Sequence, residues 1–137
     1  MCIRDRYTVG GIKTIPEVRT YVSVDGGMGD NIRPALYESE YAVVPVDRPL
    51  AERNHTVTVA GKFCESGDVL ARDVDLPEPE TGELLALPAS GAYCLMMASN
   101  YNMQTRPAVV LVNQGSSRLI RRRETYKDLL ASSIDFD

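Results

Sequence analysis

The sequence predicts an all-β domain, a barrel or a sandwich, with short helical turns and one short C-terminal helix. Short runs of β-branched and aromatic residues recur along the chain. Glycine, proline and polar turn residues separate these runs at close spacing, which is typical of β-sandwiches and β-barrels. The runs do not alternate with long helical patterns, so we do not expect a parallel sheet built from βαβ units.

Length and composition fit one small domain. The chain has 137 residues and a formal net charge of −4, with 44% hydrophobic and 25% charged residues, which is ordinary for a globular protein. The acidic balance argues against nucleic-acid binding, and no apolar run is long enough to span a membrane. The three cysteines, Cys2, Cys64 and Cys94, lack the paired spacing of a metal site. Their odd number favours a reducing cytoplasm over a disulfide framework.

The first strand is expected at residues 9–15, where apolar positions recur. Pro16 ends this strand, and the β-formers at residues 21–24 predict a second one. Residues 1–6 do not continue the pattern. We therefore expect a foreign or truncated start there, followed by one domain over residues 7–137.

The second strand ends at a glycine corner, residues 25–27, where two glycines permit backbone angles or close approaches that a Cβ would forbid. The aspartate and asparagine at 30–31 offer oxygens to cap a short helical turn, and Pro34 suits its first turn. That turn presents Arg33 and Tyr37. A guanidinium donates two hydrogen bonds to a carboxylate and a phenol adds a third, so the layout suits an anion site. The alternative is a well-capped surface turn.

The rest of the chain alternates further strands with loops. Pro45 marks an edge strand or a bulge, an alternating pattern places Val57 and Val59 on one face, and a hairpin is expected around Gly115. The arginine run at residues 121–123 is interpreted as a solvated strand edge. The expected strands are residues 41–46, 55–60, 69–74 continued by Leu76, 84–87, 108–113 and 118–122, and the expected helical segments are residues 91–100 and 125–131.

Three strings in the sequence connect these elements to a known family. They are DGGMGDNIRPALY at residues 25–37, CESGD at residues 64–68 and GAY at residues 91–93. Together they resemble the C-terminal domain of the diaminopimelate decarboxylases, which are fold-type III pyridoxal-phosphate enzymes, over nearly the whole chain. The resemblance implies a Greek-key β-domain. The family's N-terminal (β/α) barrel, with its Schiff-base lysine and phosphate loop, is absent here, because such a barrel needs roughly 250 residues.

The resemblance implies roles for five residues. Cys64 would protonate the carbanion left by carbon dioxide, since a thiol with an ordinary pKa of about 8.5 is protonated at neutral pH. Glu65 would bind the substrate amine, and both would serve the partner subunit's active site. Arg33 and Tyr37 would bind the distal carboxylate of the substrate, and Tyr93 would contact the cofactor phosphate and the substrate. Without the resemblance, Cys64 and Glu65 are a packed thiol beside a solvated acid, and Tyr93 is a core aromatic.

The implied protein is a homodimer that converts meso-diaminopimelate to L-lysine and carbon dioxide with pyridoxal 5'-phosphate. The chain would be its substrate-recognition part. A glutamate after Cys64 favours diaminopimelate, because the ornithine enzymes are associated with a cysteine-aspartate pair. The alternatives are an ornithine- or arginine-type decarboxylase of the same family, or a stand-alone β-domain without catalysis. We expect the chain alone to be inactive, since Lys13, Lys62 and Lys127 lie in no barrel-strand context.

Overall fold

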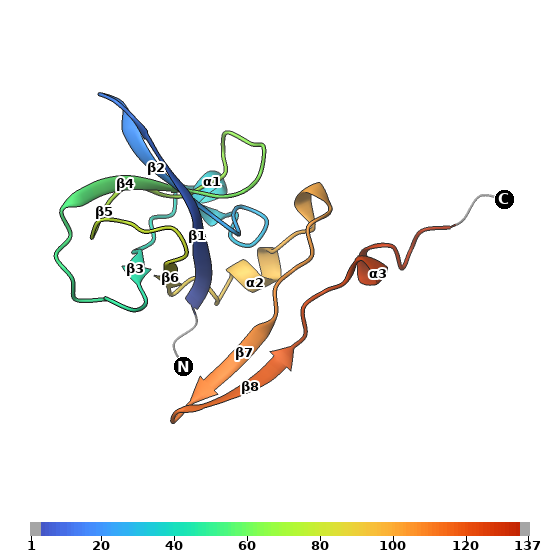
Figure 1. Ribbon diagram of the computed structural model, residues 1–137. Coiled ribbons are helices and arrows are strands. Elements are labelled where there is room, and N and C mark those ends of the chain that lie inside the picture. Colours follow the sequence, from blue (N-terminus) through green and yellow to red (C-terminus); the bar gives the residue numbers. More distant parts are fainter. Residues whose placement is uncertain (1–3, 135–137) are drawn as a thin grey trace. The chain divides into compact units, whose positions relative to one another are not determined.

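The computed structural model describes residues 4–134, which divide into two compact units, residues 4–98 and 99–134. The first unit is a curled sheet of six strands with two short helices (Figure 1). The all-β prediction is therefore confirmed. The strands of this unit are β1 (Arg4–Ile15), β2 (Arg19–Val24), β3 (Val44–Pro45), β4 (His55–Ala60), β5 (Val69–Leu76) and β6 (Leu84–Pro88), and its helices are α1 (Arg33–Tyr37) and α2 (Cys94–Met97).

The long strand β1 joins the two halves of the sheet. The strand order is β3-β6-β1-β2-β4-β5. The first half of β1 pairs antiparallel with β6, and the second half pairs antiparallel with β2 across an irregularity between Val9 and Gly11. Such a bulge bends a strand and increases its twist, so that the two halves of one strand can pair with two different neighbours. The pairing of β2 with β4 is parallel.

The first strand is longer than the sequence predicted. It begins at Arg4 and so includes half of the segment expected to be a foreign start, whose residues 1–3 lie outside the described part of the chain. Tyr7 and Val9 alternate into the core, and this burial explains why the sheet extends to this end of β1. Whether the first six residues are foreign remains a prediction.

The core is made mainly of aliphatic side chains from β1, β2, β4, β5 and β6, together with Tyr7 of β1 and Val43 just before β3. Val57 and Val59, which were expected on one face of the strand, are both buried, but Thr58 between them is buried too. The hydroxyl of Thr58 donates a hydrogen bond of 3.4 Å to Asp73, which satisfies this polar group inside the sheet. Strand β4 is therefore covered on both faces, which a simple alternating pattern does not predict.

Several predicted elements are shorter in the structure, among them the helical segment expected at residues 91–100, which is reduced to Cys94–Met97. The strand expected at residues 41–46 is reduced to Val44–Pro45, which pairs with β6 at the edge of the sheet. Pro45 agrees with this edge position, because proline has no N–H to donate to a second neighbouring strand. The C-terminal helix α3 spans only Tyr126–Leu129, and a reciprocal capping box between Thr125 and Asp128 fixes its start.

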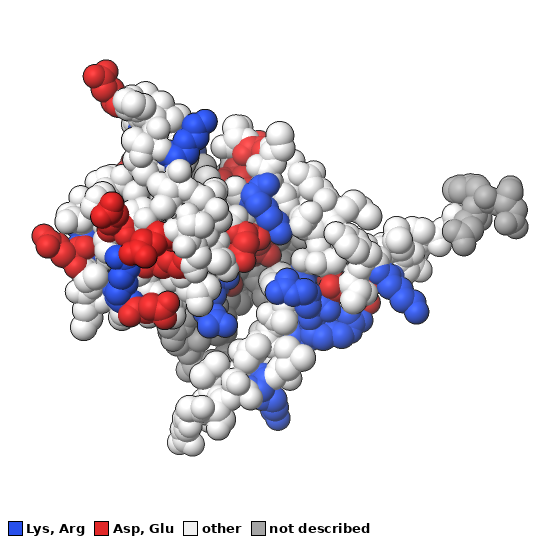
Figure 2. All heavy atoms as spheres, in the orientation of Figure 1, with Lys and Arg blue, Asp and Glu red and all other residues white. Residues whose placement is uncertain are grey.

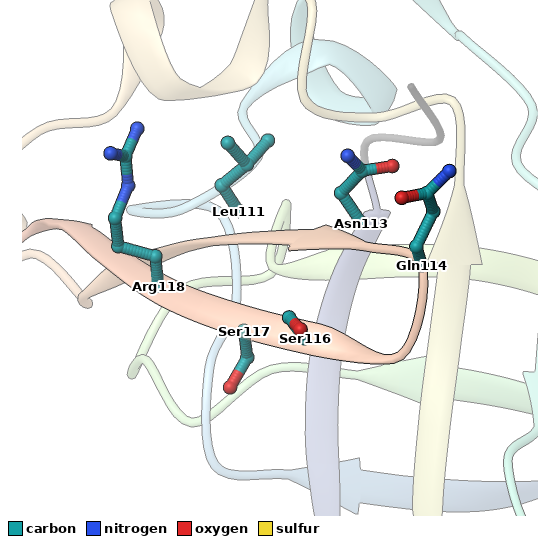
Figure 3. Close-up of a pocket in the computed structure, with 6 residues that line it drawn as sticks. All are labelled: Leu111, Asn113, Gln114, Ser116, Ser117 and Arg118. Carbon is teal, nitrogen blue, oxygen red and sulfur yellow. The ribbon is translucent and has the colours of Figure 1, made fainter.

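The second unit contains the hairpin of β7 (Val109–Asn113) and β8 (Ser116–Arg121), the 3₁₀ turn η1 (Tyr101–Met103) and α3. Gln114 and Gly115 form the two-residue turn, with φ angles of 47° and 77°, as in type I′ hairpins. A shallow hollow lies on this hairpin, where the amides of Asn113 and Gln114 lie beside each other (Figure 3). None of the predicted site residues lines this hollow.

The arginine run at the end of β8 is largely paired. Arg121 lies 3.5 Å from Glu124, and Arg122 lies 2.6 Å from Asp128. In the view of Figure 2, lysine and arginine side chains lie along the segment from β8 to α3, while aspartate and glutamate side chains gather over the six-stranded unit. Across residues 4–134, no helix is both long enough and apolar enough to cross a membrane.

Candidate active site

The glycine corner is built for close approach of other groups. Neither Gly26 nor Gly27 has a positive φ angle. A Cβ on Gly26 would lie 2.3 Å from the ring of Tyr7, and one on Gly27 would lie 2.4 Å from a carboxylate oxygen of Asp68. Of the two possibilities left by the sequence, close packing therefore explains the glycines.

Asp68 ties the glycine corner to the loop that carries Cys64. Its side chain is buried, with 3% exposure. One carboxylate oxygen accepts the N–H of Met28 at 2.6 Å, and the other accepts the N–H of Phe63 at 2.8 Å. Burial raises the pKa of Asp68, and these two N–H donors counteract that increase. The two loops are thus held together by one buried carboxyl group.

Replacing Gly61 by alanine should destabilise the first unit. A Cβ there would lie 2.1 Å from an oxygen of Asp68, so either the loop or the carboxylate must move. Overpacking of this kind costs about 1–3 kcal/mol in free energy of unfolding. Urea denaturation of the chain and of Gly61→Ala measures this difference.

The matched control for that prediction is Gly10→Ala. Its nearest neighbour would be the carbonyl oxygen of Ser23 at 3.8 Å, an ordinary contact, so its stability should differ little from the parent. Equal stability of the two variants would show that Asp68 does not restrict the loop.

The segment after the glycine corner presents helix α1, but its capping differs from the prediction. Asp30 accepts the N–H of Gly27 at 3.1 Å and so closes the corner instead of capping the helix. The N-cap residue is Ile32, which makes no side-chain cap bond. Asn31 accepts the N–H of Arg33 at 3.2 Å, and its buried Nδ2 has no hydrogen-bond partner among the described residues. Pro34 stands in the first turn, as expected.

Arg33 lies at the centre of a cluster of tyrosines. Its guanidinium carbon is 5.3 Å from the ring centroid of Tyr37 and 5.0 Å from that of Tyr93, within the range of cation–π attraction. Its Nε donates to the hydroxyl of Tyr41 at 3.1 Å. No carboxylate among residues 4–134 forms an ion pair with Arg33. The cluster therefore holds a cation that lacks a counter-charge within the described residues.

The cluster continues into the protein through a buried thiol. The hydroxyl of Tyr41 lies 3.7 Å from the sulfur of Cys94, which is 1% exposed. Because the same hydroxyl accepts the Nε–H of Arg33, its own hydrogen is free to point to that sulfur. Burial raises the pKa values of both Tyr41 and Cys94, so both remain protonated at neutral pH.

Cys64 and Glu65 lie on an exposed loop next to α1. A Cβ at Gly67 in this loop would lie 3.9 Å from the Cβ of Ala35. Glu65 accepts the N–H of Gly67 at 3.2 Å, a local bond that shapes the tip of the loop. Cys64 is a free, exposed thiol, and no hydrogen bond within the described residues joins it to Arg33 or Tyr93.

The structure thus brings three of the predicted residues together, Arg33, Tyr37 and Tyr93, and leaves Cys64 and Glu65 on a separate exposed loop. Sequence reasoning missed Tyr41, Cys94 and Asp68. No helical spacing marks Tyr41, because α1 ends at Tyr37 and the chain turns at Glu38 before it reaches Tyr41. For Cys94 and Asp68, which act through contacts distant in sequence, there was no signal either.

Comparison with known proteins identifies the family of this chain. A family model described as the C-terminal sheet domain of pyridoxal-dependent decarboxylases matches residues 6–91. The chain belongs to this decarboxylase family. The match covers Arg33, Tyr37, Tyr41, Cys64, Glu65 and Asp68, and it ends before Tyr93 and Cys94.

Individual relatives of this family are similar over most of the chain. A diaminopimelate decarboxylase of Synechocystis is 58% identical over 124 residues, which is 90% of this chain and 26% of the relative. The Bacillus subtilis one is 52% identical over 130 residues, 95% of this chain and 30% of the relative. A crystal structure of the M. jannaschii enzyme with L-lysine has 40% identity and a TM-score of 0.88, over 96% of this chain and 30% of that one. The chain thus spans less than a third of the length of each of these proteins.

Some residues of this chain fit pyridoxal phosphate, the cofactor of the decarboxylase family. Tyr93 is 65% exposed, and its hydroxyl makes no hydrogen bond within the described residues, so it is available to a phosphate oxygen. The three lysines, Lys13, Lys62 and Lys127, are all exposed. No group of three or more histidine, cysteine or acidic side chains among residues 4–134 could hold a metal ion.

Proposed function

We propose that this chain is the substrate-recognition domain of a meso-diaminopimelate decarboxylase, which releases carbon dioxide and L-lysine for lysine biosynthesis in the cytoplasm. The observation that carries the proposal is the guanidinium of Arg33. It stands between tyrosines without an acidic partner in the described residues. Such a group recognises a carboxylate by two charge-assisted hydrogen bonds. Diaminopimelate keeps a second carboxylate, distant from the one it loses, which ornithine and arginine lack.

Each proposed residue has one task. Arg33 and Tyr37 bind the distal carboxylate, and Glu65 binds an ammonium group of the substrate. Tyr93 holds a phosphate oxygen of pyridoxal 5'-phosphate, which when bound supplies the electron sink for loss of carbon dioxide. Cys64 delivers the proton that replaces the departed carboxylate at the α-carbon.

The proposed enzyme needs two further parts. One is an N-terminal barrel, since the chain spans only 26% of the Synechocystis relative. The other is a second subunit, because Cys64 and Glu65 lie on an exposed loop where they can reach a neighbouring site. The chain alone, without the barrel, is then inactive.

A chimaera tests the proposed function. This chain replaces the matching segment of the Synechocystis protein, and carbon dioxide release is measured with meso-diaminopimelate, ornithine and arginine. We expect activity with diaminopimelate only. Faster release from ornithine or arginine would assign the related decarboxylase type. A chimaera that folds and binds cofactor but is inactive on all three would indicate a non-catalytic β-domain.

A further inference from the structure

The strongest unassigned feature of the site is the hydroxyl of Tyr41. It accepts the Nε–H of Arg33 at 3.1 Å and lies 3.7 Å from the sulfur of Cys94. Arg33 belongs to α1, and Cys94 is the first residue of α2, directly after Tyr93. One hydroxyl therefore links the two helical turns that carry the proposed substrate-binding side chains.

The bond to Tyr41 determines which edge of Arg33 is available. A guanidinium can bind a carboxylate side-on, through Nε and one terminal nitrogen, or end-on, through both terminal nitrogens. Nε carries a single hydrogen, and Tyr41 accepts it. The side-on arrangement is thereby blocked. The two terminal nitrogens make no hydrogen bond within the described residues, so the end-on edge is free.

The bond also reduces the freedom of a long side chain. An arginine loses rotamer entropy when it binds a ligand, and a side chain held beforehand loses less. Tyr41 is itself half-buried, whereas Tyr37 and Tyr93 are 60% and 65% exposed. The better-buried ring with a second contact to Cys94 is the one suited to act as an anchor.

We propose that Tyr41 is a positioning residue that holds Arg33 through Nε, so that Arg33 binds a substrate carboxylate end-on through its two terminal nitrogens. This inference rests on the proposed function and deepens it. Tyr41 itself does not touch the carboxylate. Its effect is therefore on recognition of the distal carboxylate and not on proton delivery.

A double-mutant cycle in the chimaera tests the positioning role. Tyr41→Phe keeps the ring and removes the hydroxyl, and we expect it to raise the KM for meso-diaminopimelate roughly 5- to 20-fold while kcat stays within about twofold. In an Arg33→Ala background the same change should have less than about a twofold effect, because Tyr41 acts through Arg33. The control is Tyr21→Phe, whose hydroxyl makes no hydrogen bond within the described residues and whose loss should leave KM unchanged.

A second measurement is independent of catalysis. In the isotope-labelled chain, nitrogen NMR should show slow solvent exchange of the Arg33 Nε–H proton, and fast exchange in Tyr41→Phe. This readout also shows whether the variant folds.

The two proposals fail in different ways. If Arg33→Ala raises KM but Tyr41→Phe does not, or if the two effects simply add, the positioning role is wrong and the proposed function stands. Fast exchange of the Nε–H proton in the unmodified chain would likewise overturn the positioning role. If Arg33→Ala itself leaves KM unchanged, the carboxylate-binding role of Arg33 is wrong, and the role of Tyr41 falls with it.

Discussion

Cys64→Ala in the chimaera should lower kcat by about 100-fold or more while KM changes little. General acid catalysis by a positioned side chain contributes roughly 10²–10⁴-fold, and alanine has no proton to deliver. The substitution should be structurally mild, because Cys64 is an exposed thiol. Steady-state kinetics with meso-diaminopimelate measures both constants. A loss expressed mainly in KM would instead assign Cys64 to substrate binding.

The same variant tests whether the site is shared between subunits. Cys64→Ala subunits are mixed with subunits that lack the cofactor-binding lysine of the barrel, so that each parent alone is inactive. Half of the randomly formed dimers are mixed, and each mixed dimer has one complete site, so about a quarter of the parental activity should return. The control is each inactive variant carried through the same mixing alone. No recovery in demonstrably mixed dimers would mean that Cys64 serves its own subunit or none.

Arg33→Ala should lower kcat/KM for meso-diaminopimelate by about 10- to 150-fold. A hydrogen bond to a charged group contributes roughly 1.5–3 kcal/mol, and removal of the guanidinium leaves the distal carboxylate unpaired. The loss should appear chiefly in KM, in contrast to that of Cys64→Ala. The comparison of the two variants therefore separates recognition from proton delivery.

Arg72→Ala is the matched control for Arg33. Arg72 lies exposed on β5, and no ion pair involves it within residues 4–134. Its removal changes the net charge by the same amount as Arg33→Ala. Equal losses in the two variants would attribute the effect to overall charge, and the carboxylate-binding assignment of Arg33 would then be wrong.

Much of the fold was predictable because its signals are local. The sequence of β4 alternates between apolar and polar residues, which predicts a strand, and the hairpin of β7 and β8 has a glycine in its turn. Element ends were less predictable. The strand expected at residues 41–46 kept only two residues, since pairing with β6 and not β-propensity decides where a strand ends.

Among the candidate site residues, the sequence by itself determined the residue types and their order. Arg33 and Tyr37 are one helical turn apart, and the string around Cys64 carries the family resemblance. These features follow from neighbours along the chain. They predict an anion-binding side chain and an acid, but they do not say which side chains meet.

The tertiary structure decided which groups complete the site. Asp68 bonds to Met28, which lies 40 residues earlier, and Tyr41 meets Cys94 across 53 residues. A buried carboxyl group finds backbone donors, and a half-buried hydroxyl finds an arginine and a thiol, because unpaired polar groups are costly inside a protein. Which partners satisfy that requirement depends on how the strands place the loops in space. The sequence therefore determines which residue types are present at the site, and the tertiary structure determines which of them contact one another.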